Sequence, residues 1–411
     1  MILLNPTLFV GIDVSKSSNQ VYAMTFDQKK LLSTSIPNTQ DGAEIMERKF
    51  LDLLDKNALS KITIVLESTG VYSAHIATFL SASKYLAVFD VKVYIINPKI
   101  SRNYRKSFSD IDKTDPKDAY ILADIARVDR LSGLKPFKGS QRVALERLTR
   151  HRQHIAELLS IEKTYALNNV FMKFSGFTNV FSNNFGTTAV DVLLEYKTID
   201  DIINTSLEDL SNFLINASHN RFVDAVLMAE KLKLAARNSY RLDKLAYDPI
   251  NLSLASSINL ISCYENEIKD IDKAIQRQVV GFSQNQYHSL LSIPGIGKVY
   301  AAGILAEIAD INQFDSDDSL AKYAGITWRR HQSGKFESDE TSMTKTGNKY
   351  LRYFIMEAAN ITRLHNQEFK DYYQKKYNEV TTHQHKRALA LTSRKLIRLI
   401  YGLLSSNRLF Q

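Results

Sequence analysis

Four acidic residues near the start of the chain have the types and spacing of a metal-dependent phosphoryl-transfer site. Asp13 interrupts the apolar run "FVGIDV", where an aspartate is costly unless it is paired or ligates a cation. Glu67 ends the apolar run "KITIVLE". Asp115 and Asp118 lie three residues apart in "KTDPKDA", so a helix that starts there would present both on one face. Two strand acids that face two helix acids would form an oxygen cage suited to Mg²⁺.

The stretch "KTDPKDA" also has a purely structural interpretation. Asp115 is suited to cap a helix, Pro116 to occupy its first turn and Asp118 to act as the acid of a capping box. Taken alone, the stretch favours the cap, and the metal site depends on the two acids upstream. Asp110 and Asp112 precede the helix without a regular face, and Asp112 is kept as a weaker candidate.

The sequence predicts that these acids are positioned by an α/β domain over residues 1–139. We expect strands over residues 8–15, 20–26, 31–38, 61–67 and 91–98, and helices over residues 41–54 and 70–83 and from Asp115 onward. Three strands in succession, followed by alternating helices and strands, favour an RNase H-like mixed sheet over a doubly wound parallel sheet.

Residues 140–283 predict a helical, coiled-coil region. Apolar stripes run over residues 143–167 and 254–279, and Glu265 and Asp272 interrupt the second stripe at two of its positions. Two such helices, about 90 residues apart, would form either an antiparallel hairpin or a dimer-forming coiled coil. The intervening residues 168–249 carry no motif that indicates a function.

Residues 284–411 predict a mainly helical domain that opens with a phosphate-binding motif. The stretch "IPGIGKVYAAGILAEI" resembles a helix-hairpin-helix, in which Gly295 and Gly297 would let backbone N–H groups approach a phosphate beside Lys298. Such hairpins bind the DNA backbone without reading bases. The alternative is a tight turn between packed helices.

A polar loop in the same region contains a candidate nucleophile. Ser333 follows a cluster of cations, and a serine beside cations can be activated toward phosphate, although serines in polar loops are usually ordinary loop residues. Lys16, near the first acid, could contact phosphate or be a solvated strand-end lysine. The side chains predicted to contact phosphate are those of Lys16, Lys298, Arg329, Arg330, Lys345, Lys349 and Arg352.

The distribution of charge supports a polyanionic partner. The chain has a net charge of +9, and residues 321–411 hold 17 Lys and Arg against 7 Asp and Glu, so the remainder is close to neutral. The single cysteine, Cys263, excludes an internal disulfide framework and a cysteine-based zinc site. No apolar run reaches the roughly 20 residues that span a bilayer, and we expect no membrane partner and a cytoplasmic location.

The motifs together resemble a known family. "GID-S-K", "LE-TG-Y", "INP…KTD--DA", "L--IPGIG", "LAKYAGI", "QSGK" and "S-TK-GN--LR" occur in the order found in the DEDD transposases of bacterial insertion sequences, which are similar to the Piv DNA invertase. The resemblance covers nearly the whole chain except its middle. It implies a RuvC-like N-terminal domain, a coiled coil and a C-terminal transposase domain.

The resemblance also implies a chemistry. Its acidic tetrad maps onto Asp13, Glu67, Asp115 and Asp118, with Mg²⁺ as the cofactor of strand cleavage. Its serine nucleophile, which forms a covalent phosphoserine link to DNA, maps onto Ser333, with Ser342 as the second candidate.

The partners that the resemblance implies are donor and target DNA, a structured guide RNA encoded by the element, and further copies of the chain in a dimer or tetramer. An active site would then combine the N-terminal domain of one subunit with the C-terminal domain of another. Two other functions are compatible with the residues. One is a RuvC-like structure-specific endonuclease that uses water as the nucleophile. The other is a non-catalytic nucleic-acid-binding scaffold whose acids are only caps and strand-end residues.

Overall fold

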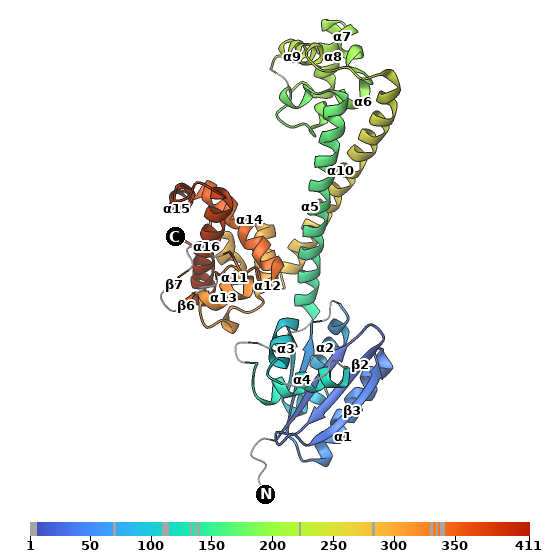
Figure 1. Ribbon diagram of the computed structural model, residues 1–411. Helices are drawn as coiled ribbons and strands as arrows, with labels where there is room; N and C mark the ends of the chain where they lie inside the picture. The colour runs from blue at the N-terminus through green and yellow to red at the C-terminus, as the bar shows by residue number, and fades with distance from the viewer. Residues whose placement is uncertain are drawn as a thin grey trace. The chain divides into compact units, whose positions relative to one another are not determined.

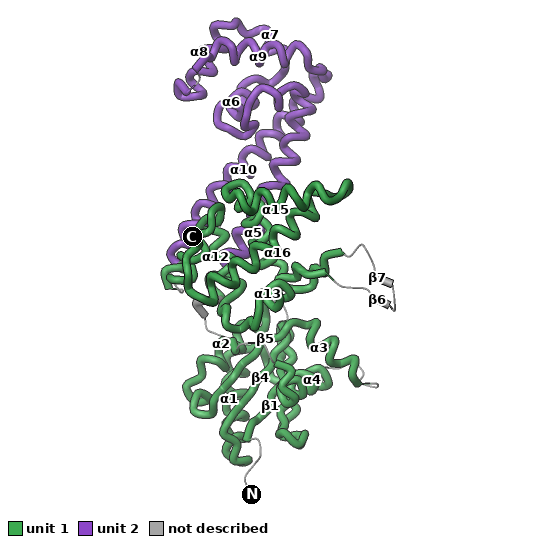
Figure 2. Tube along the Cα trace, turned by 90° about the vertical axis from the view of Figure 1, so that its left-hand side faces the viewer, with its two compact units in different colours: residues 1–146, 278–411 green, residues 147–277 purple. Residues whose placement is uncertain are grey.

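The computed structural model describes residues 6–68, 71–108, 115–131, 134, 136–137, 140–221, 223–281, 284–328, 332–333, 336–337 and 342–411. The chain forms two compact units (Figure 2): residues 1–146 with 278–411, and residues 147–277. Within the described ranges, none of the helices has the length and apolar character needed to span a membrane.

The N-terminal part is a five-stranded sheet with helices on both faces (Figure 1). Its elements are β1 (Thr7–Val14), β2 (Ser18–Met24), β3 (Lys30–Pro37), α1 (Gln40–Lys56), β4 (Lys61–Glu67), α2 (Ser73–Ala82), the 3-10 turn η1 (Leu86–Phe89), β5 (Val91–Ile96), α3 (Pro98–Arg105) and α4 (Asp115–Arg127). The strand order is β3-β2-β1-β4-β5, with β1, β2 and β3 antiparallel in turn and β4 and β5 parallel to β1. The mixed sheet predicted from the sequence is confirmed.

Successive side chains of β1 point alternately to the two faces of this sheet. Leu8, Val10 and Ile12 are fully buried and pack in one core with apolar residues of α1 and α2. Phe9 packs in a second core, together with Val65 of β4 and the apolar face of α4. Side chains two residues apart on a strand share a face, so the odd-numbered positions of β1 lie under α4.

The contact between α4 and β1 is unusually close. A β-carbon added at Gly11 would overlap the carbonyl oxygen of Ala119 and the amide nitrogen of Ala123, both in the α4 backbone. Glycine is therefore required at position 11 because the helix backbone lies directly against the strand. This contact fixes the height and the register of α4 over the sheet.

Helix α3 was missed from the sequence, where the fifth strand was expected to continue to Pro98. The strand ends at Ile96, and Asn97 caps the new helix by accepting a hydrogen bond from the Lys99 amide at 2.8 Å. Pro98 occupies the first turn, a position that suits its fixed φ angle. In the sequence, the dipeptide Asn97-Pro98 indicates a helix start, because asparagine suits the N-cap and proline suits the first turn.

The second unit is built on two long helices, α5 (Ser140–Lys173) and α10 (Lys244–Val279). Arg152 pairs with Asp272 at 2.5 Å and Lys163 with Glu265 at 2.7 Å, so the two helices run antiparallel. Of the two arrangements left open by the sequence, the antiparallel hairpin within one chain is the one observed. The two acids that interrupt the apolar stripe are the partners in these ion pairs.

Four shorter helices cover the far end of this hairpin (Figure 1). They are α6 (Thr187–Glu195), α7 (Ile199–Asn204), α8 (Leu207–Ala217) and α9 (Ala225–Arg237), with the 3-10 turn η2 (Phe177–Asn179) before them. Phe174, Phe177, Leu193, Leu210 and Leu232 are buried in their common core. The residues without a readable motif therefore form a packed helical cap.

The C-terminal part is mainly helical, as predicted. Its elements are α11 (Gln284–Leu291), α12 (Lys298–Ile308), the 3-10 turn η3 (Ile311–Gln313), α13 (Asp317–Ala324), the short strands β6 (Gln332–Ser333) and β7 (Phe336–Glu337), α14 (Lys349–His365), α15 (Gln367–Asn378) and α16 (Gln384–Ser406). Helix α12 packs closely on α14, since a β-carbon at Gly303 would lie 2.6 Å from the Phe354 ring.

Replacing Gly11 with alanine should destabilise the N-terminal part, because the added methyl group has to push α4 away from β1. We expect a loss of about 1–3 kcal/mol in the free energy of unfolding, measured by urea titration. Gly402→Ala in α16 is the matched control, because nothing lies within 4 Å of its β-carbon position, and it should stabilise by about 0.5–1 kcal/mol. Equal effects of the two substitutions would contradict the close packing.

Candidate functional site

The two strand acids are neighbours in the sheet. Ile12 of β1 pairs with Leu66 of β4 in parallel register, so Asp13 and Glu67 are the next positions along the two strands. Adjacent strands lie about 4.8 Å apart, and both acids share the face of Gly11 and Val65, which is covered by α4. The register therefore brings these carboxylates together at the carboxyl ends of parallel strands.

The helix acids lie at the start of α4, which begins at Asp115 as predicted. Asp118 directly precedes Ala119, the residue whose carbonyl group touches β1 at Gly11, so its turn lies beside the strand acids. Its carboxylate forms an ion pair with Arg105 of α3. The side chain of Asp115, and all of Asp110 and Asp112, lie outside the described part of the structure.

Helix α3 contacts both sets of acids. The Ser101 hydroxyl, which is buried, donates a 2.6 Å hydrogen bond to Oε2 of Glu67. The Tyr104 hydroxyl donates a 2.7 Å hydrogen bond to Asp124 of α4, and burial together with that carboxylate raises the pKa of Tyr104 to about 12. Sequence reasoning identified neither Ser101 nor Arg105, because the helix that carries them was not expected.

The donor chemistry of this site suits a hard divalent cation. Asp13, Glu67 and Asp118 offer carboxylate oxygens from three elements on one face of the sheet. Among the side chains that the structure describes, no group of three or more His, Cys, Asp and Glu residues is gathered closely enough to hold a metal ion. The register and the shared face thus put Asp13, Glu67 and Asp118 on one side of the sheet, without a cluster of three metal ligands among the described side chains.

The predicted phosphate-binding turn lies between α11 and α12. Gly295 has φ = +92°, and a β-carbon there would lie 2.8 Å from the Thr362 Cα of α14, so packing requires this glycine. Nothing lies within 4 Å of the β-carbon position of Gly297, which precedes the first turn of α12. Lys298 is exposed beside it. The open side of the turn is therefore at Gly297 and Lys298.

The two candidate serines lie in neighbouring segments of the C-terminal part. Ser333 ends β6, which pairs with β7 as a two-residue ladder, and its side chain is not among those described. Ser342 is exposed. The segment after it runs antiparallel to residues 325–328, with the Thr344 amide donating to the Thr327 carbonyl oxygen at 2.8 Å.

A buried acid supports the segment that follows Ser342. Glu307 of α12 is 1% exposed and accepts a 2.6 Å hydrogen bond from Nδ2 of Asn348. Oδ1 of Asn348 also caps α14 by accepting from the amides of Tyr350 and Leu351, each at 3.0 Å. Glu307 therefore ties α12 to the start of α14, and sequence reasoning had not selected it.

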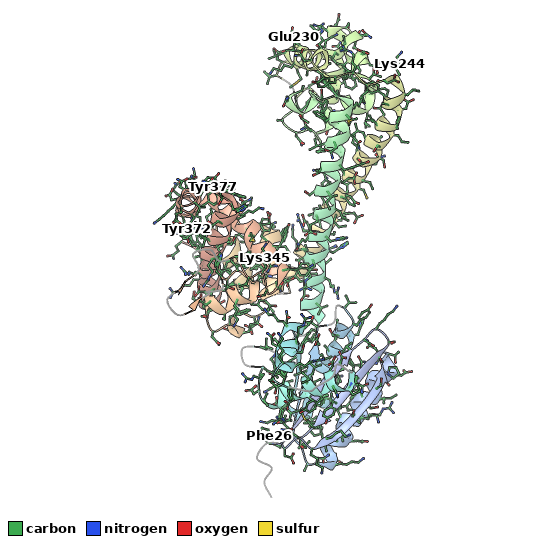
Figure 3. The ribbon with its side chains drawn as sticks, viewed as in Figure 1. Phe26, Glu230, Lys244, Lys345, Tyr372 and Tyr377 are labelled. Atoms are coloured by element: carbon green, nitrogen blue, oxygen red, sulfur yellow. The ribbon has the colours of Figure 1, made fainter. Side chains whose placement is uncertain are left out.

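The basic residues predicted to contact phosphate differ in their surroundings. Lys16 is exposed in the turn after β1, and Lys345 is exposed with φ = +49° in the C-terminal part (Figure 3). Lys349 lies over the Tyr350 ring at 4.8 Å.

Arg352 is half-buried and donates to the Ala324 carbonyl oxygen at 3.0 Å, so it supports the protein backbone. Arg329 and Arg330 lie outside the described residues.

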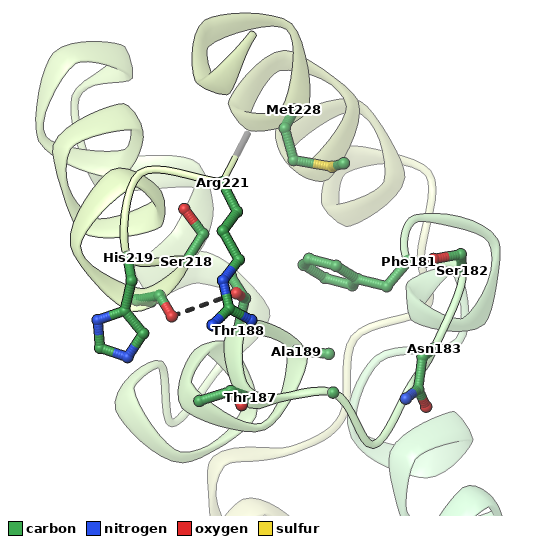
Figure 4. A pocket seen from close by; sticks show the side chains of 12 residues that line it. Phe181, Ser182, Asn183, Thr187, Thr188, Ala189, Ser218, His219, Arg221 and Met228 are labelled. Atoms are coloured by element: carbon green, nitrogen blue, oxygen red, sulfur yellow. Dashed lines mark hydrogen bonds between the residues drawn. The ribbon is translucent and has the colours of Figure 1, made fainter. Parts of the chain in front are cut away.

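The second unit has a separate open pocket of about 390 Å³. Arg221 and Thr187 extend along its walls (Figure 4), and Thr188 donates to the Ala217 carbonyl oxygen at 3.3 Å beside it. None of the residues selected from the sequence lines this pocket.

Comparisons with known proteins match both ends of the chain. Residues 10–170 match the family profile of the DEDD transposases of the IS110 type, described as "Transposase", and residues 287–374 match the profile described as "Transposase IS116/IS110/IS902 family". These ranges contain the four candidate acids of the N-terminal part and both candidate serines.

Relatives align over almost the full length. The "Insertion element IS116 uncharacterized 44.8 kDa protein" of Streptomyces clavuligerus is 25% identical over 98% of this chain and 96% of its own. The pilin gene-inverting protein of Moraxella lacunata is 22% identical over 98% of this chain and 97% of its own. Among solved structures, T. thermophilus RuvC in complex with a Holliday junction substrate is 15% identical, with a TM-score of 0.23, over 32% of this chain and 99% of its own.

Asn348→Ala should destabilise the C-terminal part more than loss of a helix cap alone. It removes the α14 cap and a hydrogen bond to the buried Glu307 carboxylate, so we expect a loss of about 2–4 kcal/mol in the free energy of unfolding. Asn366→Ala, which removes only the cap of α15, should cost about 1 kcal/mol.

Urea titration of the two variants measures the difference. An Asn348→Ala variant no less stable than Asn366→Ala would show that the contact with Glu307 contributes nothing to the stability of the fold.

Proposed function

We propose that this chain, which belongs to the IS110 family of insertion-sequence transposases, cuts and rejoins DNA with a carboxylate-bound metal ion and a serine nucleophile. The proposal of a metal ion rests on the arrangement of the acids. Asp13 and Glu67 follow a register pair of adjacent parallel strands, on the face covered by the helix that carries Asp118. A site built from regular elements holds its groups in fixed positions, as phosphoryl transfer requires.

The metal ion in this proposal is Mg²⁺. Asp13, Glu67, Asp115 and Asp118 would hold it, since carboxylate oxygens are its preferred protein ligands. When bound, the ion would stabilise the negative charge that develops on the transferred phosphate. Within the protein, Ser101 orients Glu67, and the α4 contact at Gly11 sets the height of the helix acids over the strand acids.

The nucleophile in this proposal is Ser333, with Ser342 as the second candidate. The serine oxygen would attack a DNA phosphorus atom, forming a serine–phosphate ester and releasing a sugar hydroxyl. Family membership supports a serine, and Ser333 is the last residue of β6, which pairs with β7. The buried contact between Glu307 and Asn348 supports the segment that follows Ser342.

The partners follow from charge and from the family. The exposed Gly297–Lys298 turn, with Lys16, Lys345 and Lys349, would contact DNA or RNA phosphates, and the basic C-terminal region would attract them. A structured guide RNA and assembly into a dimer or tetramer are proposed from family membership alone. In such an assembly the acids of one subunit would act with the serine of another.

An alternative function is a RuvC-like endonuclease that uses the same acids and takes water as the nucleophile. It predicts strand cleavage without a covalent protein–DNA intermediate. A non-catalytic nucleic-acid-binding scaffold predicts neither cleavage nor binding of divalent cations by these acids.

Asp13→Asn and Glu67→Gln should each abolish Mg²⁺-dependent cutting of DNA that contains the ends of the element. We expect a fall in rate of at least about 100-fold, because each substitution removes a charged ligand of the metal ion. Strand cleavage assayed on a denaturing gel measures the rate. Asp52→Asn, an exposed acid of α1, is the control and should cut like the wild type. Full cutting by either site variant would refute the metal site.

The serine is tested by trapping the covalent intermediate. Wild-type protein incubated with labelled DNA and Mg²⁺, then denatured, should carry DNA on a phosphoserine. We expect this adduct to disappear in Ser333→Ala and to remain in Ser342→Ala. The reverse pattern would assign the role to Ser342, and cleavage without any adduct would favour the water-dependent endonuclease.

A further inference from the structure

We propose that Arg105 of α3 is a positioning residue that holds Asp118 and competes with a divalent cation for its carboxylate. The inference rests on the proposed function, because it concerns the acids assigned there to Mg²⁺. It adds a regulatory element to that site, namely a built-in counter-charge whose removal should change how tightly the site binds metal.

The ion pair between Arg105 and Asp118 is largely shielded from water. The side chains of Arg105 and Asp118 are 23% and 19% exposed. In contrast, the Lys273–Asp270 pair on α10 is 73% and 71% exposed, and such surface pairs contribute little. Because solvent and salt screen a partly buried pair less, the guanidinium exerts a strong field at Asp118.

The position of Arg105 is fixed by the rest of α3. Ser101 and Arg105 lie four residues apart and therefore on one face of the helix. On that face, Ser101 donates to Glu67 of β4 and Arg105 pairs with Asp118 of α4, while Tyr104 beside them donates to Asp124. One short helix thus joins a strand acid and a helix acid of the candidate site, so the guanidinium is held at the site.

The charge of Arg105 has two consequences. Carboxylates placed together repel one another, and a nearby cation favours their charged forms, so Arg105 stabilises the assembled acids before a metal ion arrives. The same positive charge repels an entering dication and occupies Oδ1 of Asp118. A divalent cation that uses Asp118 must therefore share that carboxylate with the guanidinium or displace it. Removal of the charge should weaken the metal-free fold and tighten metal binding.

The experiment measures Mn²⁺ binding by the full-length protein, with free Mn²⁺ followed by electron paramagnetic resonance. We expect Arg105→Gln to bind Mn²⁺ about tenfold more tightly than the wild type, because one unit of positive charge has left the site. Arg102→Gln is the matched control. It removes the same charge from an exposed position on the same helix, and its affinity should stay within about twofold of the wild type.

A purely structural role for Arg105 predicts a different result. Loss of a structural contact would loosen the site and weaken Mn²⁺ binding, so unchanged or weaker binding by a folded Arg105→Gln protein would overturn the inference. Arg105→Lys serves if Arg105→Gln does not fold. Its ammonium group pairs less well with Asp118, so its affinity should rise by about threefold, and an unchanged affinity would overturn the inference.

Asp13→Asn separates this inference from the proposed function. If Asp13→Asn abolishes Mn²⁺ binding and Arg105→Gln leaves the affinity unchanged, the carboxylate site stands and the competition by Arg105 is wrong. If Asp13→Asn binds Mn²⁺ as the wild type does, the cation lies elsewhere, and both the proposed metal site and the inference fail.

Discussion

Helix α4 can lie directly against strand β1 because residue 11 has no side chain. A larger residue would lift the helix and separate Asp118 from the acids at the ends of β1 and β4. The parallel register of these two strands places Asp13 beside Glu67, and the glycine contact sets the helix above them. The candidate site therefore depends on backbone packing within regular elements.

Buried polar contacts then fix the groups that this packing brings together. Ser101 donates to Glu67, and Arg105 pairs with Asp118, so α3 stabilises acids from two different elements. The C-terminal part uses a similar arrangement, in which Glu307 accepts from Asn348 at the start of α14. In both places a shielded carboxylate joins two elements through a short hydrogen bond or ion pair. Such contacts are costly to leave half made, so they give each site one defined geometry.

The sequence predicted the parts of the site that depend on local patterns. Asp13 was recognisable as a charge within an apolar strand, and the start of α4 was recognisable from the proline and acids of its first turn. Glu307 gives the same signal as Asp13, a lone acid in the apolar "KVYAAGILAEI", and could have been selected by the same rule. Helix α3 has only eight residues, and Ile100 is its one aliphatic side chain apart from Pro98, so the helix was harder to predict from the sequence. The contacts of Ser101 and Arg105 depend on how α3 packs against β4 and α4, which no local pattern encodes.

From the sequence alone, the stretch "KTDPKDA" fits either a helix cap or a metal site. A helix does begin at Asp115, and its first turn lies where β1 ends. A good helix start and a metal ligand are compatible, because the same turn that begins the helix also directs its acids along one face. Arg105 of α3 pairs with Asp118, a contact that is compatible with both interpretations. In the proposed metal site, its shielded guanidinium would balance the charge of the neighbouring carboxylates until a metal ion takes over that role.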